Sequence, residues 1–164
     1  MDKQIETVEK TSFEDFLNSY GYLLYTSVGF SMLPFLKQKR DIIEIKKPET
    51  LQCKKYDVVL YKRANRYILH RILKVLPDGY IIAGDNNTFI ETDIKDENIL
   101  GVMTKVIKKG KVITPDNLWY KLYVHLWCDL YPLRFCILRM TKFICRCLCY
   151  LKRKVLGFGK NKAT

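Results

Sequence analysis

The sequence predicts a mainly β protein of the α+β class, and three observations indicate it. Short segments rich in Val, Ile, Leu and Tyr recur between residues 22 and 113, separated by turn sequences such as PDGY and GDNN. Hydrophobic residues make up 48% of the 164 residues, which is enough apolar surface to form a core. The length suits one domain with a real core rather than two.

A short helix is predicted over residues 11–21, in an amino-terminal segment of residues 1–21. Ser12 is placed to cap this helix, with Asp15 three residues on, and Gly21 is placed to end it. Three apolar residues share one face and predict that the helix packs against the body: Phe13, Phe16 and Leu17.

Six segments of residues 22–113 are predicted as strands of an antiparallel or barrel-like body. Each is short, rich in β-branched or aromatic residues and bounded by turn residues, so a helix is the less favoured interpretation. The segments are YLLYTSV (22–28), DIIEIKK (41–47), DVVLYKR (57–63), RYILHRILKVL (66–76), GYIIAG (79–84) and LGVMTKVIKKG (100–110).

Residues 114–164 form a basic, aromatic and Cys-rich tail that is predicted to be helical. Thr114 or Asp116 is the candidate cap, and Pro132 separates two helices. Cations interrupt the apolar run too often for an ordinary membrane span, so an interfacial pair of amphipathic helices is expected. The alternative is that the same helices pack on the sheet of the domain.

The charge of the chain predicts an anionic partner. The formal net charge is +12, and from Asp116 onward ten Lys or Arg face only two Asp, which gives that part a net charge of +8. Both the phosphate backbone of nucleic acid and an anionic bilayer surface suit such a tail, and charge alone does not choose between them.

The six cysteines predict reduced thiols rather than a disulfide framework. Five of them lie in the tail and only Cys53 lies elsewhere, which is typical of a protein from a cytosolic compartment. The CRCLC stretch has no second ligand pair at zinc spacing, so no metal and no cofactor are expected. The polar start, MDKQIETVEK, predicts neither a signal peptide nor a span, and hence a cytoplasmic or peripheral, cytoplasmic-face location.

The stretch GFSMLPFL (29–36) places Ser31 among apolar residues, behind a glycine and ahead of a proline. A serine hydroxyl needs a neighbouring base before it attacks a carbonyl carbon. The chain has two histidines. His125 lies within the aromatic tail, whereas His70 lies on a predicted strand in ILHRILKV, and an imidazole with a pKa near 6.5 is a suitable base. Taken alone, the pair is also consistent with a turn serine and a packed histidine.

The motifs GFSMLPFL, DVVLYKR, ILHRILKV, AGDNN (83–87) and ILGVMTKV follow one another in an order that resembles the serine peptidases of the type I signal peptidase clan. The resemblance covers about residues 22–107. It implies a strand-rich catalytic body like that of signal peptidases and SOS repressors, with Ser31 as nucleophile and His70 as general base. Most bacterial members have Lys at the base position, so His70 resembles the endoplasmic-reticulum and sporulation type. Lys74 is not favoured as the base, because it lies over ten Å along the strand from His70.

The acid that holds the second nitrogen of His70 stays open among three residues. In the histidine-type relatives it lies a few residues beyond the Gly-Asp-Asn motif, where this chain has TFIETD. Glu91 matches best in spacing and Asp93 in residue type, while Asp85 belongs to the motif itself. For Asp85 the alternative role is that of a turn cap.

The loop around Ser31 is expected to supply the other parts of the site. The Ser31 N–H is a candidate oxyanion donor, with Gly29 where many bacterial relatives carry a hydroxyl, and Pro34 shaping the turn. Three residues are candidates for the substrate groove, or else simply for the core: Met32, Leu33 and Phe35.

The expected function is therefore a serine endopeptidase that cleaves signal or leader peptides at a membrane surface. The alternative is a non-catalytic module that binds nucleic acid or an acidic partner through its basic tail, with nucleic acid the less favoured partner. A self-cleaving repressor is disfavoured, because no helix-turn-helix pattern precedes the strands and no Lys occupies the base position.

Overall fold

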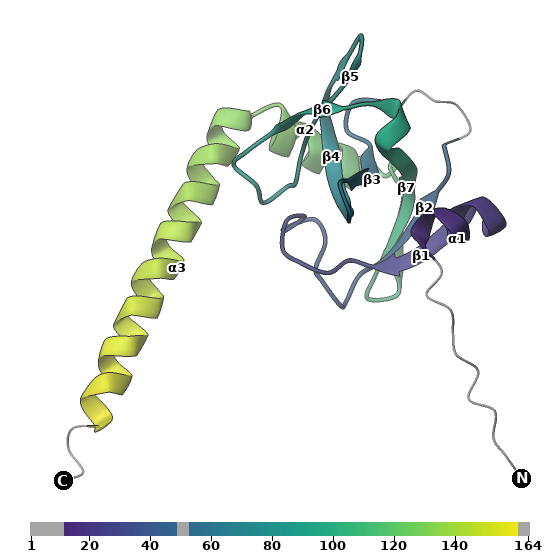
Figure 1. The fold of residues 1–164 in the computed structure, drawn as a ribbon. Helices are drawn as coiled ribbons and strands as arrows, with labels where there is room; N and C mark the ends of the chain where they lie inside the picture. Colours follow the sequence, from purple (N-terminus) through teal and green to yellow (C-terminus); the bar gives the residue numbers. More distant parts are fainter. Residues whose placement is uncertain (1–11, 49–52, 161–164) are drawn as a thin grey trace, which may run out of the picture. The chain divides into compact units, whose positions relative to one another are not determined.

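The computed structural model describes residues 12–48 and 53–160 (Figure 1). The chain divides into two compact units, Met1–Lys121 and Leu122–Thr164. This division falls inside the first tail helix, later than the predicted boundary at residue 114. The expectations for the polar start of the chain lie outside the described residues.

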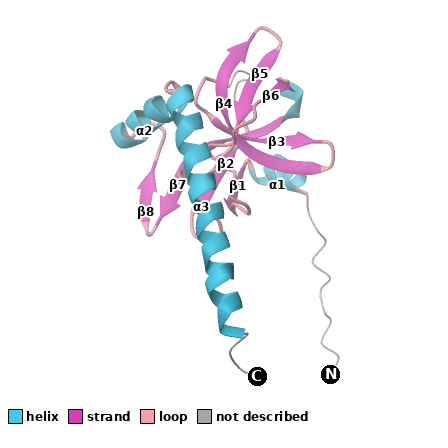
Figure 2. Cartoon of the chain, turned by 90° about the vertical axis from the view of Figure 1, so that its left-hand side faces the viewer, coloured by secondary structure: helices cyan, strands magenta, loops and turns pink. Residues whose placement is uncertain are grey.

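The first unit is built on an eight-stranded sheet, and the prediction of a mainly β, α+β protein is confirmed. Every strand pair is antiparallel, in the order β1-β2-β7-β3-β4-β5-β6, with β8 paired to β7. Figure 2 shows β4, β5 and β6 as neighbouring arrows of this sheet. The strands are β1 Tyr22–Thr26, β2 Ile42–Lys46, β3 Val58–Arg63, β4 Arg66–Leu76, β5 Gly79–Ala83, β6 Glu91–Ile94, β7 Ile99–Lys108 and β8 Lys111–Ile113.

All six predicted strands form, and two further strands were not predicted. The first, β6, has the sequence ETDI, in which only Ile94 is buried, so it lacks the apolar alternation that marks a strand. The second, β8, has three residues and continues from β7 through a turn at Lys109 and Gly110. Both strands form because a longer partner strand supplies the hydrogen bonds.

The predicted helix before the sheet is confirmed as α1, Phe13–Tyr20. The Ser12 side chain accepts a hydrogen bond from the Asp15 N–H, and Gly21 ends the helix in the left-handed conformation. Phe13 contacts the rings of Tyr25 and Tyr67. The helix is thereby fixed on β1 and β4.

A buried cluster between β3, β4, β5 and β6 forms the core beside the predicted base. Val59 and Tyr61 lie two positions apart on β3, as do Tyr80 and Ile82 on β5, so each pair points to one face of the sheet. The cluster consists of Cys53, Val59, Tyr61, Ile72, Tyr80, Ile82 and Ile94. Tyr61 carries a polar hydroxyl group into this core.

Two helices follow the sheet, α2 over Leu118–Cys128 and α3 over Tyr131–Lys160, as predicted. The cap of α2 is neither Thr114 nor Asp116, because the Asn117 side chain accepts the N–H groups of the first turn. Pro132 lies in the first turn of α3, where its missing N–H costs nothing. A single 3-10 turn, η1 over Asp96–Asn98, connects β6 and β7.

Candidate active site

The loop that carries Ser31 runs from the end of β1 to the start of β2 and is held by its own hydrogen bonds. Gly29 has φ of +107°, a conformation that favours glycine, and its N–H donates to Gln38 Oε1 at 2.9 Å. The Leu36 N–H donates to the Met32 carbonyl at 2.8 Å and closes the turn that follows Ser31. Because the Gly29 N–H already has an acceptor, Gly29 contributes to this site as a turn residue.

The far side of the loop is anchored to β7. Lys108 Nζ donates to the Phe35 carbonyl and lies 4.1 Å from the centre of the Phe35 ring. Burial lowers the pKa of Lys108, and the nearby charge of Asp41 opposes that shift. The Leu33–Pro34 peptide within the loop is cis, and Pro34 itself is exposed.

The Gly-Asp-Asn motif clamps the loop directly at the serine. The Asn86 N–H donates to the Ser31 carbonyl at 2.7 Å, and Asn86 Nδ2 donates to the Phe30 carbonyl at 3.1 Å. Two segments more than fifty residues apart in sequence are therefore joined at Ser31, the predicted nucleophile.

Gly84 is the point at which Ser31 and His70 meet. A Cβ placed on Gly84 would lie 2.6 Å from the Ser31 carbonyl oxygen and 2.9 Å from His70 Nε2. Both residues thus approach the same backbone position, and only glycine leaves room for them. Within the described part of the chain, no hydrogen bond joins the Ser31 hydroxyl to His70, and such catalytic contacts often tighten only when substrate binds.

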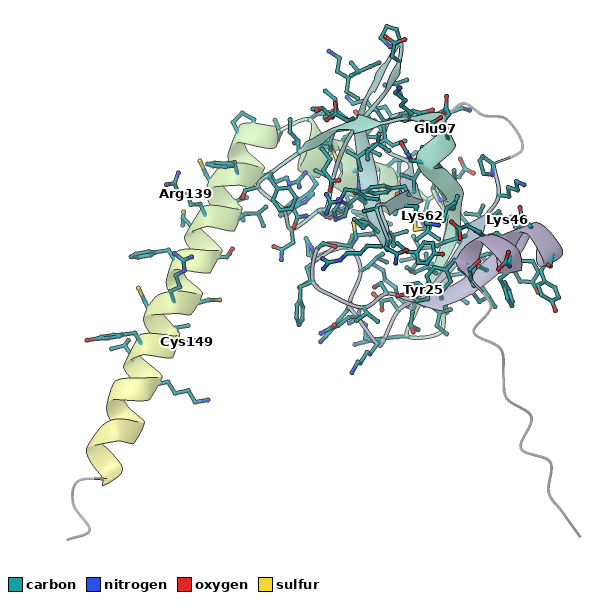
Figure 3. The ribbon with its side chains drawn as sticks, viewed as in Figure 1. Tyr25, Lys46, Lys62, Glu97, Arg139 and Cys149 are labelled. Atoms are coloured by element: carbon teal, nitrogen blue, oxygen red, sulfur yellow. The ribbon has the colours of Figure 1, made fainter. Side chains whose placement is uncertain are left out.

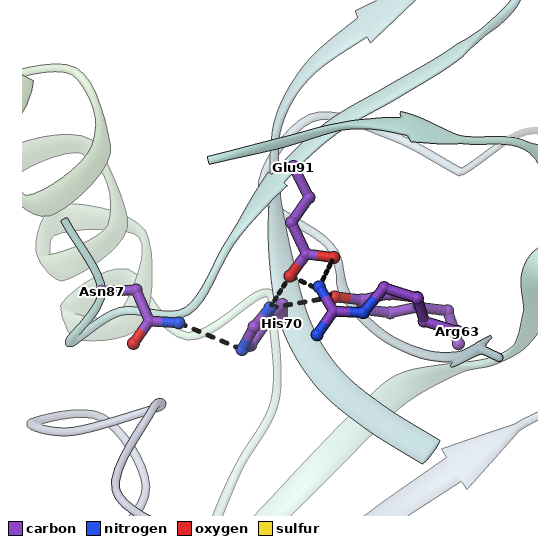
Figure 4. A network of polar contacts seen from close by, with 5 residues as sticks. Arg63, His70, Asn87 and Glu91 are labelled. Atoms are coloured by element: carbon purple, nitrogen blue, oxygen red, sulfur yellow. Dashed lines mark hydrogen bonds and ion pairs between the residues drawn. The ribbon is translucent and has the colours of Figure 1, made fainter. Parts of the chain in front are cut away.

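His70 lies on β4 with 4% of its surface exposed, and both of its ring nitrogens have neighbours (Figure 4). Nδ1 lies 3.1 Å from Tyr61 Oη and 3.4 Å from Glu91 Oε1. Nε2 lies 3.4 Å from Asn87 Nδ2. Burial lowers the pKa of His70 below its ordinary value of 6.5, while the charges of Glu91 and Asp85 oppose this shift. The imidazole is therefore neutral at neutral pH, as a general base must be.

Of the three candidate acids, Glu91 is the one that contacts the imidazole. It projects from β6 toward His70, and its other oxygen pairs with Arg63 Nη1 at 2.6 Å (Figure 4). Asp93 is exposed on the same strand. The spacing beyond the Gly-Asp-Asn motif thus selected the contacting residue better than residue type did.

Asp85 forms a buried, bidentate pair with Arg71. Its two oxygens lie 2.9 and 2.8 Å from Arg71 Nε and Nη2, and both side chains are 0% exposed. Arg71 Nη1 also donates to the Tyr56 carbonyl and to Tyr120 Oη. Because Arg71 engages both of its oxygens, Asp85 holds the motif against β4.

A pocket of about 210 Å³ opens beside Ser31. Of the three groove candidates, Met32 lines this pocket, whereas Phe35 packs its ring 5.2 Å from that of Tyr120, and Leu33 is half-buried outside the lining. Of the other lining residues, Ser27, Val28 and Gly29 belong to the loop itself, and Gly29 was already a candidate from the sequence. The remaining walls come from α1, β1, β3 and β4, and their residues were not predicted: Phe13, Tyr25, Leu60, Tyr67, Ile68 and Leu69.

The remaining candidate groups do not compete for this chemistry. His125 is exposed and lies 2.9 Å from Asp129, one turn on along the chain, and Lys74 is exposed on β4. Burial raises the pKa of the Cys53 thiol to about 11, which keeps this thiol protonated. In residues 12–48 and 53–160, no three His, Cys, Asp or Glu side chains come together as a metal site.

Two polar residues of the site escaped the sequence-based prediction, namely Tyr61 and Arg63. Both lie in DVVLYKR, where Tyr61 looks like an ordinary strand aromatic. The available signal is register: Tyr61 is two positions beyond Val59, which pairs with His70, so its ring lies diagonally across from the imidazole.

Comparisons of the chain with models of protein families, with curated proteins and with solved structures find no significant match.

Proposed function

We propose that this chain is a serine endopeptidase of the signal-peptidase type, in which Ser31 is the nucleophile and His70 the general base. The observation that carries the proposal is that the Ser31 carbonyl oxygen and His70 Nε2 both approach Gly84, at 2.6 and 2.9 Å from the place that a Cβ would take there. The signal-peptidase-like fold is part of the same proposal, which also rests on the order of the sequence motifs.

The arrangement supports acyl transfer as follows. His70 Nε2 takes the proton of the Ser31 hydroxyl as Oγ attacks the carbonyl carbon of the scissile peptide bond. The Ser31 N–H stabilises the oxyanion. The C–N bond then breaks, the imidazolium returns its proton to the leaving amine, and a water molecule activated by the same nitrogen hydrolyses the ester. Glu91 stabilises the imidazolium that forms in each half of the reaction.

The pocket beside Ser31 supports a peptide substrate. It lies next to the outer strand β1, whose edge offers backbone hydrogen bonds to an extended chain. We infer that the client is a signal or leader peptide, bound as an added strand with a side chain in this pocket.

The second unit supports action at an anionic membrane surface on the cytoplasmic side. From Leu130 onward the chain has nine Lys or Arg and no Asp or Glu. Helix α3 exposes large apolar side chains at helical spacing, Met140, Ile144 and Leu148, and Figure 3 shows Arg139 and Cys149 projecting from it. An amphipathic basic helix binds anionic lipid in the plane of the interface. No helix in the described part of the chain is both long and apolar enough to cross a membrane.

Covalent labelling tests the peptidase proposal. A serine-directed fluorophosphonate is expected to modify Ser31, as located by mass spectrometry, and to fail with Ser31→Ala and with His70→Ala. Cleavage of synthetic leader peptides is expected to follow the same pattern. Modification of another serine, or equal labelling of all three proteins, would contradict the assignment.

The same basic tail supports a second candidate, a non-catalytic module that binds an acidic partner or nucleic acid. This function predicts a binding affinity that falls with salt and that is unchanged by Ser31→Ala and by His70→Ala. Sedimentation assays distinguish the membrane-surface proposal from this second candidate. The chain is sedimented with phosphatidylcholine vesicles, with and without phosphatidylserine, and with a nucleic acid duplex. Binding only to the phosphatidylserine vesicles, reduced by Met140→Asp, is expected from the membrane-surface proposal.

A further inference from the structure

The hydroxyl of Tyr61 lies between the base and the acid of the candidate site. Tyr61 Oη is 3.1 Å from His70 Nδ1 and 2.9 Å from Glu91 Oε1. The direct separation of His70 Nδ1 from Glu91 Oε1 is longer, at 3.4 Å. The shorter route from the imidazole to the carboxylate therefore passes through the tyrosine.

The protons of this chain of contacts have only one consistent arrangement. Glu91 is paired with Arg63 at 2.6 Å, so its carboxylate accepts hydrogen bonds and cannot donate one. The single phenolic proton of Tyr61 consequently points to Glu91. The Tyr61 oxygen is then the acceptor in its contact with His70, and Nδ1 must carry the proton.

The contact on the other side of the ring agrees with this assignment. Asn87 Nδ2 is a donor and lies 3.4 Å from His70 Nε2, so Nε2 is the nitrogen with the lone pair. That same nitrogen lies beside Gly84, where the Ser31 backbone also approaches. The lone pair thus faces the side on which a proton would be taken.

Packing holds the tyrosine in place. Tyr61 is 0% exposed and belongs to the core cluster between β3 and β6, with its ring centre 5.9 Å from that of His70. Burial raises the pKa of Tyr61 strongly, because an ionised phenol has no water there and would face Glu91. The hydroxyl keeps its proton and remains a fixed link.

We propose that Tyr61 is a positioning residue that relays the hydrogen bond from Glu91 to His70 and so holds the imidazole in the Nδ1–H tautomer. The inference rests on the proposed function in one respect only: it gives the tautomer a use, because Nε2 must be unprotonated to accept the serine proton. The arrangement of protons itself is independent of any peptidase activity.

Nuclear magnetic resonance of the full-length chain, labelled with ¹⁵N-histidine, tests the tautomer at pH 8. With only two histidines in the sequence, His125→Gln assigns the signals. The expected spectrum shows His70 protonated on Nδ1 and unprotonated on Nε2. Tyr61→Phe is expected to bring in the Nε2–H form, and Glu91→Gln as well, since the hydroxyl proton is then able to turn toward Nδ1.

Tyr80→Phe is the matched control. Tyr80 is buried in the same core cluster and also donates its hydroxyl to a carboxylate, that of Asp96, yet it does not contact His70. Its loss is expected to leave the His70 spectrum unchanged. An Nε2–H form in the wild-type protein, or a Tyr61→Phe spectrum equal to that of the wild type, would overturn the proposal, as would a Glu91→Gln spectrum without change.

Cleavage of a leader peptide supplies the second readout. Tyr61→Phe is expected to lower kcat/KM by about 10-fold to 1,000-fold, less than the roughly 10⁴-fold that a wrong tautomer costs when a triad acid is lost, whereas Tyr80→Phe retains the wild-type value. Should the wild-type chain cleave no peptide but show the Nδ1–H form, the peptidase proposal fails and the relay stands. Cleavage that proceeds equally in Tyr61→Phe would overturn the positioning role.

Discussion

Replacing Gly84 with alanine tests whether the candidate site depends on close approach at this residue. The added methyl group would lie 2.6 Å from the Ser31 carbonyl oxygen and 2.9 Å from both His70 Nε2 and Asn87 Nδ2. Each distance is shorter than a carbon makes in a packed interior. The Ser31 carbonyl belongs to the backbone, so the whole loop must move rather than a flexible side chain.

The size of the effect follows from these contacts. Overpacking a well-filled site costs about 1–3 kcal/mol, and loss of the Asn86 to Ser31 hydrogen bond of 2.7 Å adds about 0.5–1.5 kcal/mol. We expect the free energy of unfolding to fall by about 2–4 kcal/mol and the melting temperature by about 10 °C. The rate of Ser31 labelling is also expected to fall, by more than the loss of stability accounts for, because the loop and the imidazole separate.

Circular dichroism during heating and mass spectrometry of the labelled protein measure the two effects. Gly110→Ala is the matched control, since Gly110 has φ of +78° and a methyl group added there would meet no atom within 4 Å. It is expected to cost about 1–2 kcal/mol through backbone strain alone and to leave the labelling rate unchanged. A Gly84→Ala protein that melts and labels like the wild type would refute the reasoning.

Breaking the buried pair by Arg71→Ala or Asp85→Ala is expected to lower the free energy of unfolding in urea by about 3–5 kcal/mol, because a charge is left buried without its partner; a loss below about 1 kcal/mol would contradict the burial. Asn117→Ala is expected to cost about 1 kcal/mol by removing the cap of α2, and Asp116→Ala nearly nothing, as urea titrations of both variants measure. Burial lowers the pKa of His70 in the folded chain. As the pH falls below 6.5, the unfolded chain therefore binds a proton before the folded chain does, so the free energy of unfolding is expected to decrease until the pH reaches the folded-state pKa. The acid limb of kcat/KM is likewise expected below pH 6.5, and a limb above that value would contradict the burial of the base.

Local chemistry made much of the fold predictable. Ser12 and Gly21 cap α1 through contacts within a few residues, and the six strand segments carry their own apolar patterns between turn residues. The polar strand β6 was missed because its hydrogen bonds come from β5, a partner that its own composition does not reveal. Asn117 could not be chosen as the cap of α2 over its neighbours, because several nearby polar residues can each cap a helix.

The same distinction holds for the candidate site: its local features were predictable from the sequence, whereas its contacts between distant segments were not. The sequence by itself determined the residue types of the proposed site, a serine in a tight turn and a histidine on a strand, because these depend on the residue and its immediate neighbours. Only the tertiary structure decided that Glu91 contacts His70, that Asp85 pairs with Arg71 and that Tyr61 lies between base and acid. Those choices depend on strand register and on which side chains share a buried space, and both are set by contacts between segments that lie far apart in the chain.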